Sequence, residues 1–329
     1  MSHFSLYMRD WVQSSCALAG ARIPVCVIVA QMLRITTSTA PTRWTPFIEK
    51  LAAEEFPPAM ILHAKILGRR GKFNDAFTLL DNKILPRISP QARALSPFED
   101  MLLGGGIETP HMLYATLLKS YDAMYGSPES VKKAEEMTKI AALQYHDPNA
   151  LAEYACQMMD ENNLDEYEDC MSMAATAGIG KPCLFLANFY YLTYLGQFPT
   201  RGERNAGILK PTTGPPPNLT STPDLNKSKL ERFVTFVSSF FGQSLERGRY
   251  RDLAHEWYLL AWQHGERRAL FMMALLDREN GYDHDGMVML QHARMDLDPD
   301  YAHKLEALKD NWWDETYEPK LPKRMLDVR

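Results

Sequence analysis

Small residues recur at helical spacing in this chain, most clearly between residues 254 and 269. The sequence there is AHEWYLLAWQHGERRA, which contains an aromatic pair, Trp257-Tyr258. Its small residues are Ala254, Ala261, Gly265 and Ala269. Residues three and four positions apart lie on one face of an α-helix, so small side chains there let two helices approach closely. The spacing therefore predicts helices in close contact.

Two looser copies of this pattern occur upstream and start 33 residues apart. At steps of three and four residues they contain Ala134, Met137, Ala141 and Tyr145, and then Tyr167, Cys170, Ala174 and Gly178. Repetition in this range of periods is typical of stacked helical hairpins. We therefore predict an all-α fold, a right-handed α-solenoid of about six helical hairpins in which each hairpin packs on its neighbours.

The segment from Gly248 to Ala269 resembles the Sel-one-like repeat, a variant of the tetratricopeptide repeat. In that family a turn with Gly is followed by Ala, an aromatic pair, one or two Ala, a second Gly, and an Ala on the next helix. The matching positions here are Gly248, Ala254, Trp257, Tyr258, Ala261, Gly265 and Ala269. The resemblance implies a scaffold or adaptor, and it brings no catalytic residues with it.

The upstream copies are similar to the same repeat in part. They supply its small residues with Ala134, Ala141, Ala142, Ala174, Ala175 and Gly178. They also depart from it, because Tyr145 or His146 stands where Gly is expected, and Pro182 stands near the last small position of the second copy. The hairpin from Ala59 to Leu85, which turns at Gly71, instead resembles a generic tetratricopeptide or pentatricopeptide unit.

Proline, glycine and composition divide the chain into five parts. These are an N-terminal segment at 1–48, a first block of helical repeats at 49–195, an insertion at 196–229, a second block with a C-terminal capping helix at 230–313, and an extended tail at 314–329. No strand is predicted. Helices are expected at residues 45–55, 59–68, 75–85, 112–125, 131–143, 149–159, 165–177, 184–195, 230–245, 249–264, 267–279, 287–294 and 299–313. The helix at 184–195 is apolar nearly all round, so it should be deeply buried.

Three segments are expected to lie outside the packed helices. The insertion contains six prolines among Gly, Thr and Ser, so neither helix nor strand is expected there, and the stretch from Pro199 to Pro223 should be mobile. The tail around residues 318–324 should be extended and solvated. The first 48 residues hold four arginines and one acid with many Ser and Thr, a composition typical of mitochondrial targeting. The alternative is a disordered or loosely helical start of a cytoplasmic protein.

Overall charge and cysteine usage narrow the function classes. The 36 basic and 41 acidic residues give a net charge of −5, which provides no bulk attraction to nucleic acid or anionic lipid. The longest apolar run, Ile23 to Ala30, is far shorter than the roughly 20 residues that span a bilayer, so no membrane insertion is expected. Five cysteines without C-x-x-C spacing favour a reducing compartment. Cys156, Cys170 and Cys183 lie among Ala, Met and Leu and are expected to act as small hydrophobic residues.

No residue set predicts catalysis, a cofactor or a metal site. A Gly-x-Ser-x-Gly nucleophile motif does not occur. His255 and His264 have no second ligand at metal-binding spacing, and the loop that starts at Asp283 lacks the acid that a calcium loop needs at its twelfth position. The acidic stretch 160–169 is expected to be a solvated turn and helix start, or else an acidic docking surface. Trp312-Trp313 is either a partner anchor or part of a helix that caps the last hairpin.

Two functions are compatible with these features. The leading one is a non-enzymatic scaffold that binds a protein segment on its inner surface, within a multi-protein assembly. The alternative is a mitochondrial RNA-associated factor of pentatricopeptide type, because basic residues outnumber Asp75 and Asp81 in the first hairpin. The basic residues are Lys65, Arg69, Arg70, Lys72, Lys83 and Arg87. Such a patch can bind phosphates, but reading RNA bases requires many regular repeats.

Overall fold

The computed structural model describes residues 15–17, 19–35, 43–88, 108–208, 245–293, 299–314, 317 and 323–329. Within these ranges the regular elements are all helical and no strand occurs, which confirms the predicted all-α class. The chain divides into two compact units, Met1–Ala150 and Leu151–Arg329. The boundary lies inside α9 (Pro148–Asp160), whereas the sequence pattern divides the helical blocks at the insertion 196–229.

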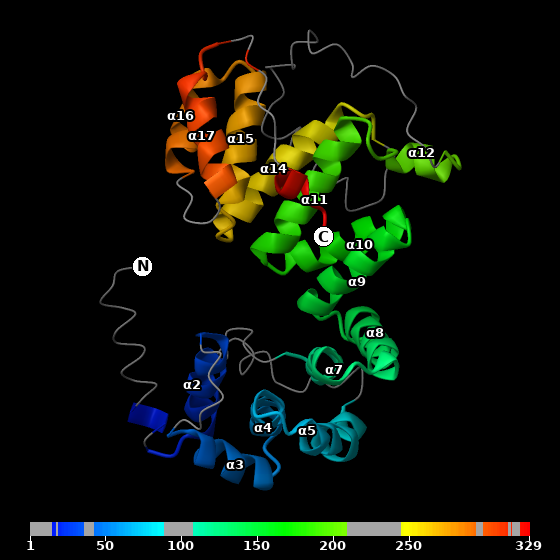
Figure 1. The fold of residues 1–329 in the computed structure, drawn as a ribbon, viewed down its shortest axis with the longest axis vertical. Helices are drawn as coiled ribbons and strands as arrows, with labels where there is room; N and C mark the ends of the chain where they lie inside the picture. The colour runs from blue at the N-terminus through cyan, green and yellow to red at the C-terminus, as the bar shows by residue number, and fades with distance from the viewer. Residues whose placement is uncertain are drawn as a thin grey trace. The chain divides into compact units, whose positions relative to one another are not determined.

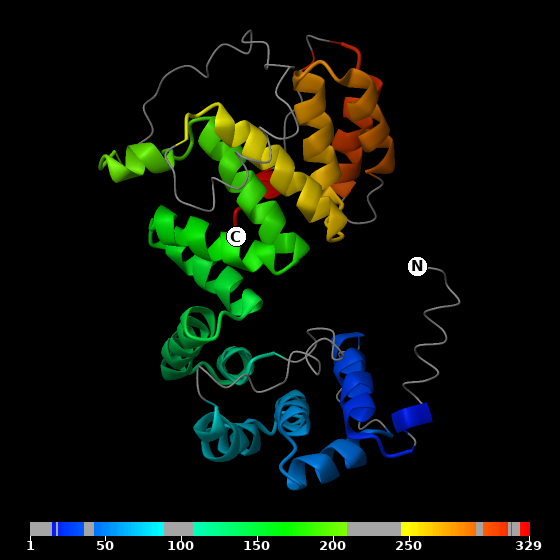
Figure 2. The ribbon, with the colours of Figure 1, turned by 180° about the vertical axis from the view of Figure 1, so that it is seen from behind.

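The first unit consists of helices joined by short turns and loops (Figures 1 and 2), and several of these helices begin at a proline. Its elements are α2 (Arg22–Ile35), α3 (Thr45–Ala53), α4 (Pro57–Arg69), α5 (Phe73–Leu79), the π-helical turn η1 (Leu80–Ile84), the 3-10 turn η2 (Leu85–Arg87), α7 (Pro110–Tyr125) and α8 (Pro128–Leu143). Pro57, Pro110 and Pro128 each occupy the first position of a helix, where the missing N–H has no intrahelical partner to lose. Proline therefore marks where one helix ends and the next begins.

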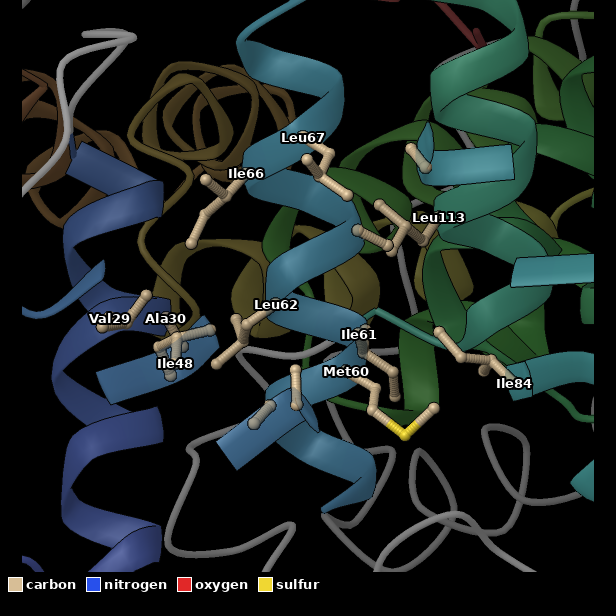
Figure 3. Packing of buried hydrophobic residues seen from close by; sticks show 14 of the residues in the cluster. Val29, Ala30, Ile48, Met60, Ile61, Leu62, Ile66, Leu67, Ile84 and Leu113 are labelled. Atoms are coloured by element: carbon tan, nitrogen blue, oxygen red, sulfur yellow. The ribbon is translucent and has the colours of Figure 1, made fainter. Parts of the chain in front are cut away.

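Helix α2 is part of the hydrophobic core of the first unit. Val25, Cys26, Val29 and Ala30 are buried in a cluster with residues of α3, α4 and α7. Figure 3 shows Val29 and Ala30 beside Ile48 of α3. Disorder is therefore the wrong prediction for residues 22–35, which form a packed helix, and a targeting role for residues 1–48 stays a prediction. Their apolar side chains form a helical stripe that packs on α3 and α4.

In the second unit, several helices pack on a helix that is close to them along the chain. The unit contains most of α9, then α10 (Leu164–Thr176), α11 (Gly180–Tyr194), α12 (Arg201–Asn205), α14 (Arg249–Gln263), α15 (Arg268–Glu279), α16 (Asp283–His292), α17 (Pro299–Asp310) and the 3-10 turn η3 (Lys323–Leu326). Helix α10 packs on α11, α11 on α14, α14 on α15, and α15 on α16. The most extensive of these pairs is α11 with α14, on the two sides of the insertion.

The predicted burial of the helix near residues 184–195 is confirmed. Every residue of α11 except Lys181 is buried. Pro182 lies in the first turn of this helix, where proline is tolerated, so its departure from the repeat pattern does not interrupt the helix. Helix α11 is consequently covered on all sides, by α10, α14 and the C-terminal η3.

Two turns of the second unit touch each other. Gly178 and Gly265 have φ angles of 81° and 95°, in the left-handed region that favours glycine. A Cβ atom at Gly180 would lie 2.9 Å from the carbonyl oxygen of His264, which is closer than real side chains come. The turn before α11 therefore lies directly against the turn after α14.

Two other positions of the repeat pattern behave differently. Gly248 has a φ of −59°, and a Cβ atom added there would have no neighbouring atom within 4 Å. Neither its conformation nor its surroundings therefore require glycine. His146 stands where the repeat expects Gly and adopts a φ of 51°. The chain thus makes the left-handed turn at this point with a histidine.

Two segments that were expected to be irregular contain helical turns. Helix α12 lies in the first part of the insertion 196–229, and Arg204 on it is buried. The tail contains η3 and buries Met325 and Val328, so it is not extended and solvated there. Residues 209–244, which include most of the insertion and the helix expected at 230–245, lie outside the described residues.

Candidate functional site

A short C-terminal segment packs into the second unit. The tail segment, Lys323–Arg329, contacts α11 through η3, and both ribbon views place the C-terminus beside α10 and α11 (Figures 1 and 2). Met325 and Val328 are its buried apolar side chains, whereas Asp327 and Arg329 are exposed. Two side chains three positions apart therefore anchor this segment.

Asn188 binds the backbone of the tail segment. It lies on α11 and only 1% of its surface is exposed. Its amide nitrogen donates to the carbonyl oxygens of Met325 at 2.8 Å and of Asp327 at 2.6 Å. A primary amide has two N–H donors, so these two carbonyls use both of them. The sole amide on an otherwise nearly apolar helix is thereby satisfied by a segment more than 130 residues away.

Two buried tyrosines complete the polar part of the site. The Tyr167 hydroxyl on α10 donates to the carbonyl oxygen of Val328 at 2.9 Å, and the Tyr258 hydroxyl on α14 donates to Oδ1 of Asn188 at 2.7 Å. Burial raises the pKa of both phenols well above the ordinary value, so both remain protonated donors. The tail site is thus formed by Tyr167, Asn188 and Tyr258 from three helices, α10, α11 and α14.

An exposed ion pair lies at the edge of the tail site. Arg329 pairs with Asp160 at the end of α9, and both side chains are more than half exposed. Solvent screens such a pair, so it contributes less than about 1 kcal/mol. Removing the buried hydrogen bonds costs more, because each buried group left without a partner costs about 1–3 kcal/mol. The buried donors of the site consequently require a segment that presents carbonyl groups to them.

A second polar cluster surrounds the start of the insertion. The side chain of Arg204 donates to Asp165 Oδ1 at 2.7 Å and to the carbonyl oxygen of Pro199 at 3.0 Å, and it pairs with Glu168. Glu168 also accepts from the Tyr190 hydroxyl at 3.1 Å. Burial raises the pKa of the Glu168 carboxyl, although Arg204 opposes this shift. The acidic stretch 160–169 is therefore only partly solvated, and the prediction of a simple solvated turn is wrong for Glu168.

The same region links the two sides of the insertion. Thr200 and Glu203 form a capping box at the start of α12, with Thr200 N donating to Glu203 Oε2 at 2.6 Å. Arg247, which follows the insertion, donates to both oxygens of Glu203 at 2.7 and 2.9 Å and to the carbonyl oxygen of Phe198 at 3.3 Å. These contacts hold the chain before and after residues 209–244 in one place. They explain why α12 forms in a proline-rich region.

The predicted repeat residues are mostly at helix contacts. The alanines of the pattern are all buried, namely Ala134, Ala141, Ala142, Ala174, Ala175, Ala254, Ala261 and Ala269. Trp257 and Tyr258 are also buried, and Tyr258 belongs to the tail site. The pattern thus reports packing, and one of its aromatic residues also takes part in binding the tail segment.

The predicted basic patch is partly neutralised by acids from outside the first hairpin. The pairs are Lys65 with Glu108 at 2.7 Å, Arg70 with Glu49 at 3.2 Å, and Arg87 with Glu55 at 2.9 Å. The Arg69 side chain donates to the carbonyl oxygen of Leu33. Lys72 and Lys83 are exposed. Counting charges within the hairpin therefore overstates the positive charge available to a phosphate.

The two tryptophans near the C-terminus and the histidines considered as ligands do not lie together in one site. Trp312 is 1% exposed and donates to the carbonyl oxygen of Asp283 at 3.0 Å, whereas Trp313 is 61% exposed and meets His284 edge to face. His255 lies 3.3 Å from Asp277 in a polar hollow between α14 and α15, apart from the exposed His264. Nowhere in the described ranges do three or more His, Cys, Asp or Glu side chains form a group that could hold a metal ion.

The cysteines and the lengths of the helices bear on two further expectations. The five cysteines are free. Burial raises the pKa of Cys170 and Cys183 to about 11 and that of Cys156 above its ordinary value, so these thiols stay protonated. Cys170 and Cys183 are buried, as expected of small hydrophobic residues, whereas Cys156 is only partly buried. Of the helices described, none combines the length and apolar character needed to cross a membrane.

No protein-family model, curated protein or solved structure matches this chain. The resemblance to the Sel-one-like repeat therefore depends on the residues of this chain alone, and the tail site must be interpreted from its own chemistry.

Tyr167 and Tyr258 are predicted from the sequence as repeat positions, whereas Asn188 is not predicted as a site residue. A signal for it was present, because Asn188 interrupts the apolar sequence FLANFYYL, and a buried amide needs hydrogen-bond partners. That signal predicts a buried polar contact. It does not reveal that the partner is the tail segment, because the two are joined only in the folded unit.

Proposed function

We propose that this protein is a non-enzymatic helical-repeat scaffold that binds a protein segment within a multi-protein assembly. One observation carries the proposal. Asn188 and Tyr167, both buried, direct three hydrogen bonds at the backbone carbonyls of a short segment, and that segment adds only two buried side chains. Side-chain donors on helices that bind backbone carbonyl groups can hold a short segment with little dependence on its side chains.

The architecture that we propose is a right-handed α-solenoid of Sel-one-like or tetratricopeptide-like hairpins. Three findings support it for the second unit: consecutive packing of α10, α11, α14 and α15, burial of the alanines in the pattern, and contact between the turns at Gly180 and His264. A solenoid grows by such neighbour contacts. The first unit supports it less directly, through its successive helix pairs α3 with α4 and α7 with α8.

The competing proposal, an RNA-associated factor, has less support. Three of the six basic residues of its patch pair with acids within 3.2 Å, which leaves mainly the exposed Lys72 and Lys83 for phosphate contacts. Mitochondrial import, with a cytoplasmic location as the alternative, stays part of the proposal because of the arginine-rich start. A cleavage that removed residues 22–35 would also remove buried side chains from the core of the first unit.

Affinity purification from the native source tests the proposal. The full chain and its Lys72→Glu/Lys83→Glu variant are each purified with and without ribonuclease, and co-purifying proteins are identified by mass spectrometry. These lysines are exposed, so their reversal leaves the ion pairs of the first hairpin intact. Partners retained under all four conditions support the scaffold. Partners lost with ribonuclease and with the charge reversal reject it in favour of RNA binding.

A further inference from the structure

We infer that the tail segment is a replaceable intramolecular ligand, and that the partner of the tail site is a protein segment with two aliphatic residues three positions apart followed by a basic residue. This inference rests on the proposed scaffold function. It names the class of partner and the way in which the same site is regulated.

The backbone contacts do not select a sequence. Asn188 and Tyr167 bind the carbonyl oxygens of Met325, Asp327 and Val328 and touch none of their side-chain polar groups through these bonds. Any segment with the same local backbone conformation can accept the same three hydrogen bonds. The polar part of the site is therefore compatible with a segment from another protein.

The side chains of the tail segment define the preferred partner. Met325 and Val328 are buried, whereas Asp327 between them is exposed. Burial of two aliphatic side chains is the main apolar gain, at about 1.5–3 kcal/mol for each fully buried side chain. Arg329 adds a weak preference for a basic residue through Asp160. The resulting pattern is aliphatic, two variable residues, aliphatic, then basic.

The site is built without the tail segment. Its three residues come from α10, α11 and α14, which pack on one another through buried alanines and aromatic residues. Departure of the tail leaves those helix contacts in place. It leaves the amide donors of Asn188 without these two acceptors, whereas the Tyr167 hydroxyl keeps a longer contact of 3.4 Å to the carbonyl oxygen of Phe185.

The tail segment is tethered close to the site. Arg278 on α15 donates to the carbonyl oxygens of Asp314 and Tyr317, at 2.5 and 3.1 Å, and five residues separate Tyr317 from Lys323. A short tether produces an effective concentration of the order of millimolar. A partner segment must therefore bind with additional contacts, or at high local concentration, to replace the tail.

Fluorescence anisotropy with a labelled peptide of sequence KRMLDVR, which matches residues 323–329, tests this inference. The full chain is compared with its Met325→Asp/Val328→Asp variant and with a matched variant changed at an exposed position of the same segment, Asp327→Asn. We expect the first variant to bind the peptide at least about ten-fold more tightly than the full chain, because its own tail no longer competes. The matched variant should bind like the full chain, and a control peptide KRDLDDR should not bind.

Three results would overturn the inference: no peptide binding by a folded Met325→Asp/Val328→Asp variant, equal binding of both peptides, or equal affinity of that variant and the unmodified chain. A tail-exchanged dimer of the unmodified chain, detected by light scattering, would also overturn it, because the tail would then be a ligand for a second copy.

Hydrogen exchange on the unmodified chain covers the case in which the double variant does not fold. Excess isotope-labelled KRMLDVR should reduce protection of the chain's own residues 323–329 and leave α11 protected. Unchanged protection of the tail at saturating peptide would show a permanent core segment and reject exchange. The scaffold proposal is tested separately by its retained partners, so it survives if exchange fails and partners remain.

Discussion

Helix α2 and the tail segment are held in their units by different forces. Helix α2 inserts Val25, Cys26 and Val29 into an apolar cluster, where contact area determines the stabilisation. The tail segment buries two side chains, but its backbone carbonyls are bound by Asn188 and Tyr167. Apolar packing depends on the shapes of the side chains of α2. The backbone hydrogen bonds of the tail segment do not depend on the shapes of its side chains. The tail segment can therefore be replaced by another chain, whereas α2 cannot.

The largest effect is expected in α2. Val29→Asp places a charge without a partner in the core of the first unit, and we expect a loss of more than about 3 kcal/mol in the free energy of unfolding. Thermal denaturation followed by circular dichroism measures it. The control Gln31→Asp lies on the same helix at an exposed position and should change little. Equal stability of the two variants would show that α2 is not part of the core.

A change inside the helix contacts of the second unit should have the next largest effect. Ala261→Leu adds volume at a position of α14 that is fully buried. Such overpacking should lower the free energy of unfolding by about 1–3 kcal/mol. Chemical denaturation can be compared with that of Gln263→Leu, an exposed change on the same helix. A variant as stable as the parent would contradict close packing of these helices, and with it the idea that the tail site is preformed.

A change at the buried tail residue Met325 should lower stability less than a change inside the helix contacts. Met325→Asp should destabilise docking of the tail by about 1–2 kcal/mol, because the segment can leave the site and so limits the loss. Trypsin should then cleave after Arg324 faster than in the parent, while helical circular dichroism is retained. Global unfolding caused by this change would place the tail in the same category as α2.

The smallest effect concerns one hydrogen bond. Tyr167→Phe keeps the buried ring but removes the donor to the carbonyl oxygen of Val328, so tail docking should weaken by about 0.5–1.5 kcal/mol. The rate of trypsin cleavage after Arg324 reports it. Arg329→Gln removes only the exposed pair with Asp160 and should have a smaller effect. The reverse order would mean that surface charge, and not the buried backbone contact, holds the tail.

Most of the helices could be predicted from the sequence. Prolines mark the starts of α4, α7 and α8, and the apolar sequence of α11 predicts burial on all sides. Such features are local, because helix spacing and the missing proline N–H act within one or two turns. Helix α2 and α12 were missed for the same reason. In α2, the arginine-rich composition of the N-terminal segment obscured a short apolar stripe. In α12, the proline-rich composition of the insertion obscured a capping box.

The sequence by itself determined the all-helical class, the faces on which small residues meet, and the burial of Tyr167 and Tyr258 as positions of a repeat. Only the tertiary structure showed that Asn188 on α11 binds the tail segment, and that acids from outside the first hairpin neutralise its basic residues. The physical reason is range. Periodicity encodes which face of a helix is apolar, whereas a hydrogen bond or ion pair between distant residues depends on which helices the fold brings together.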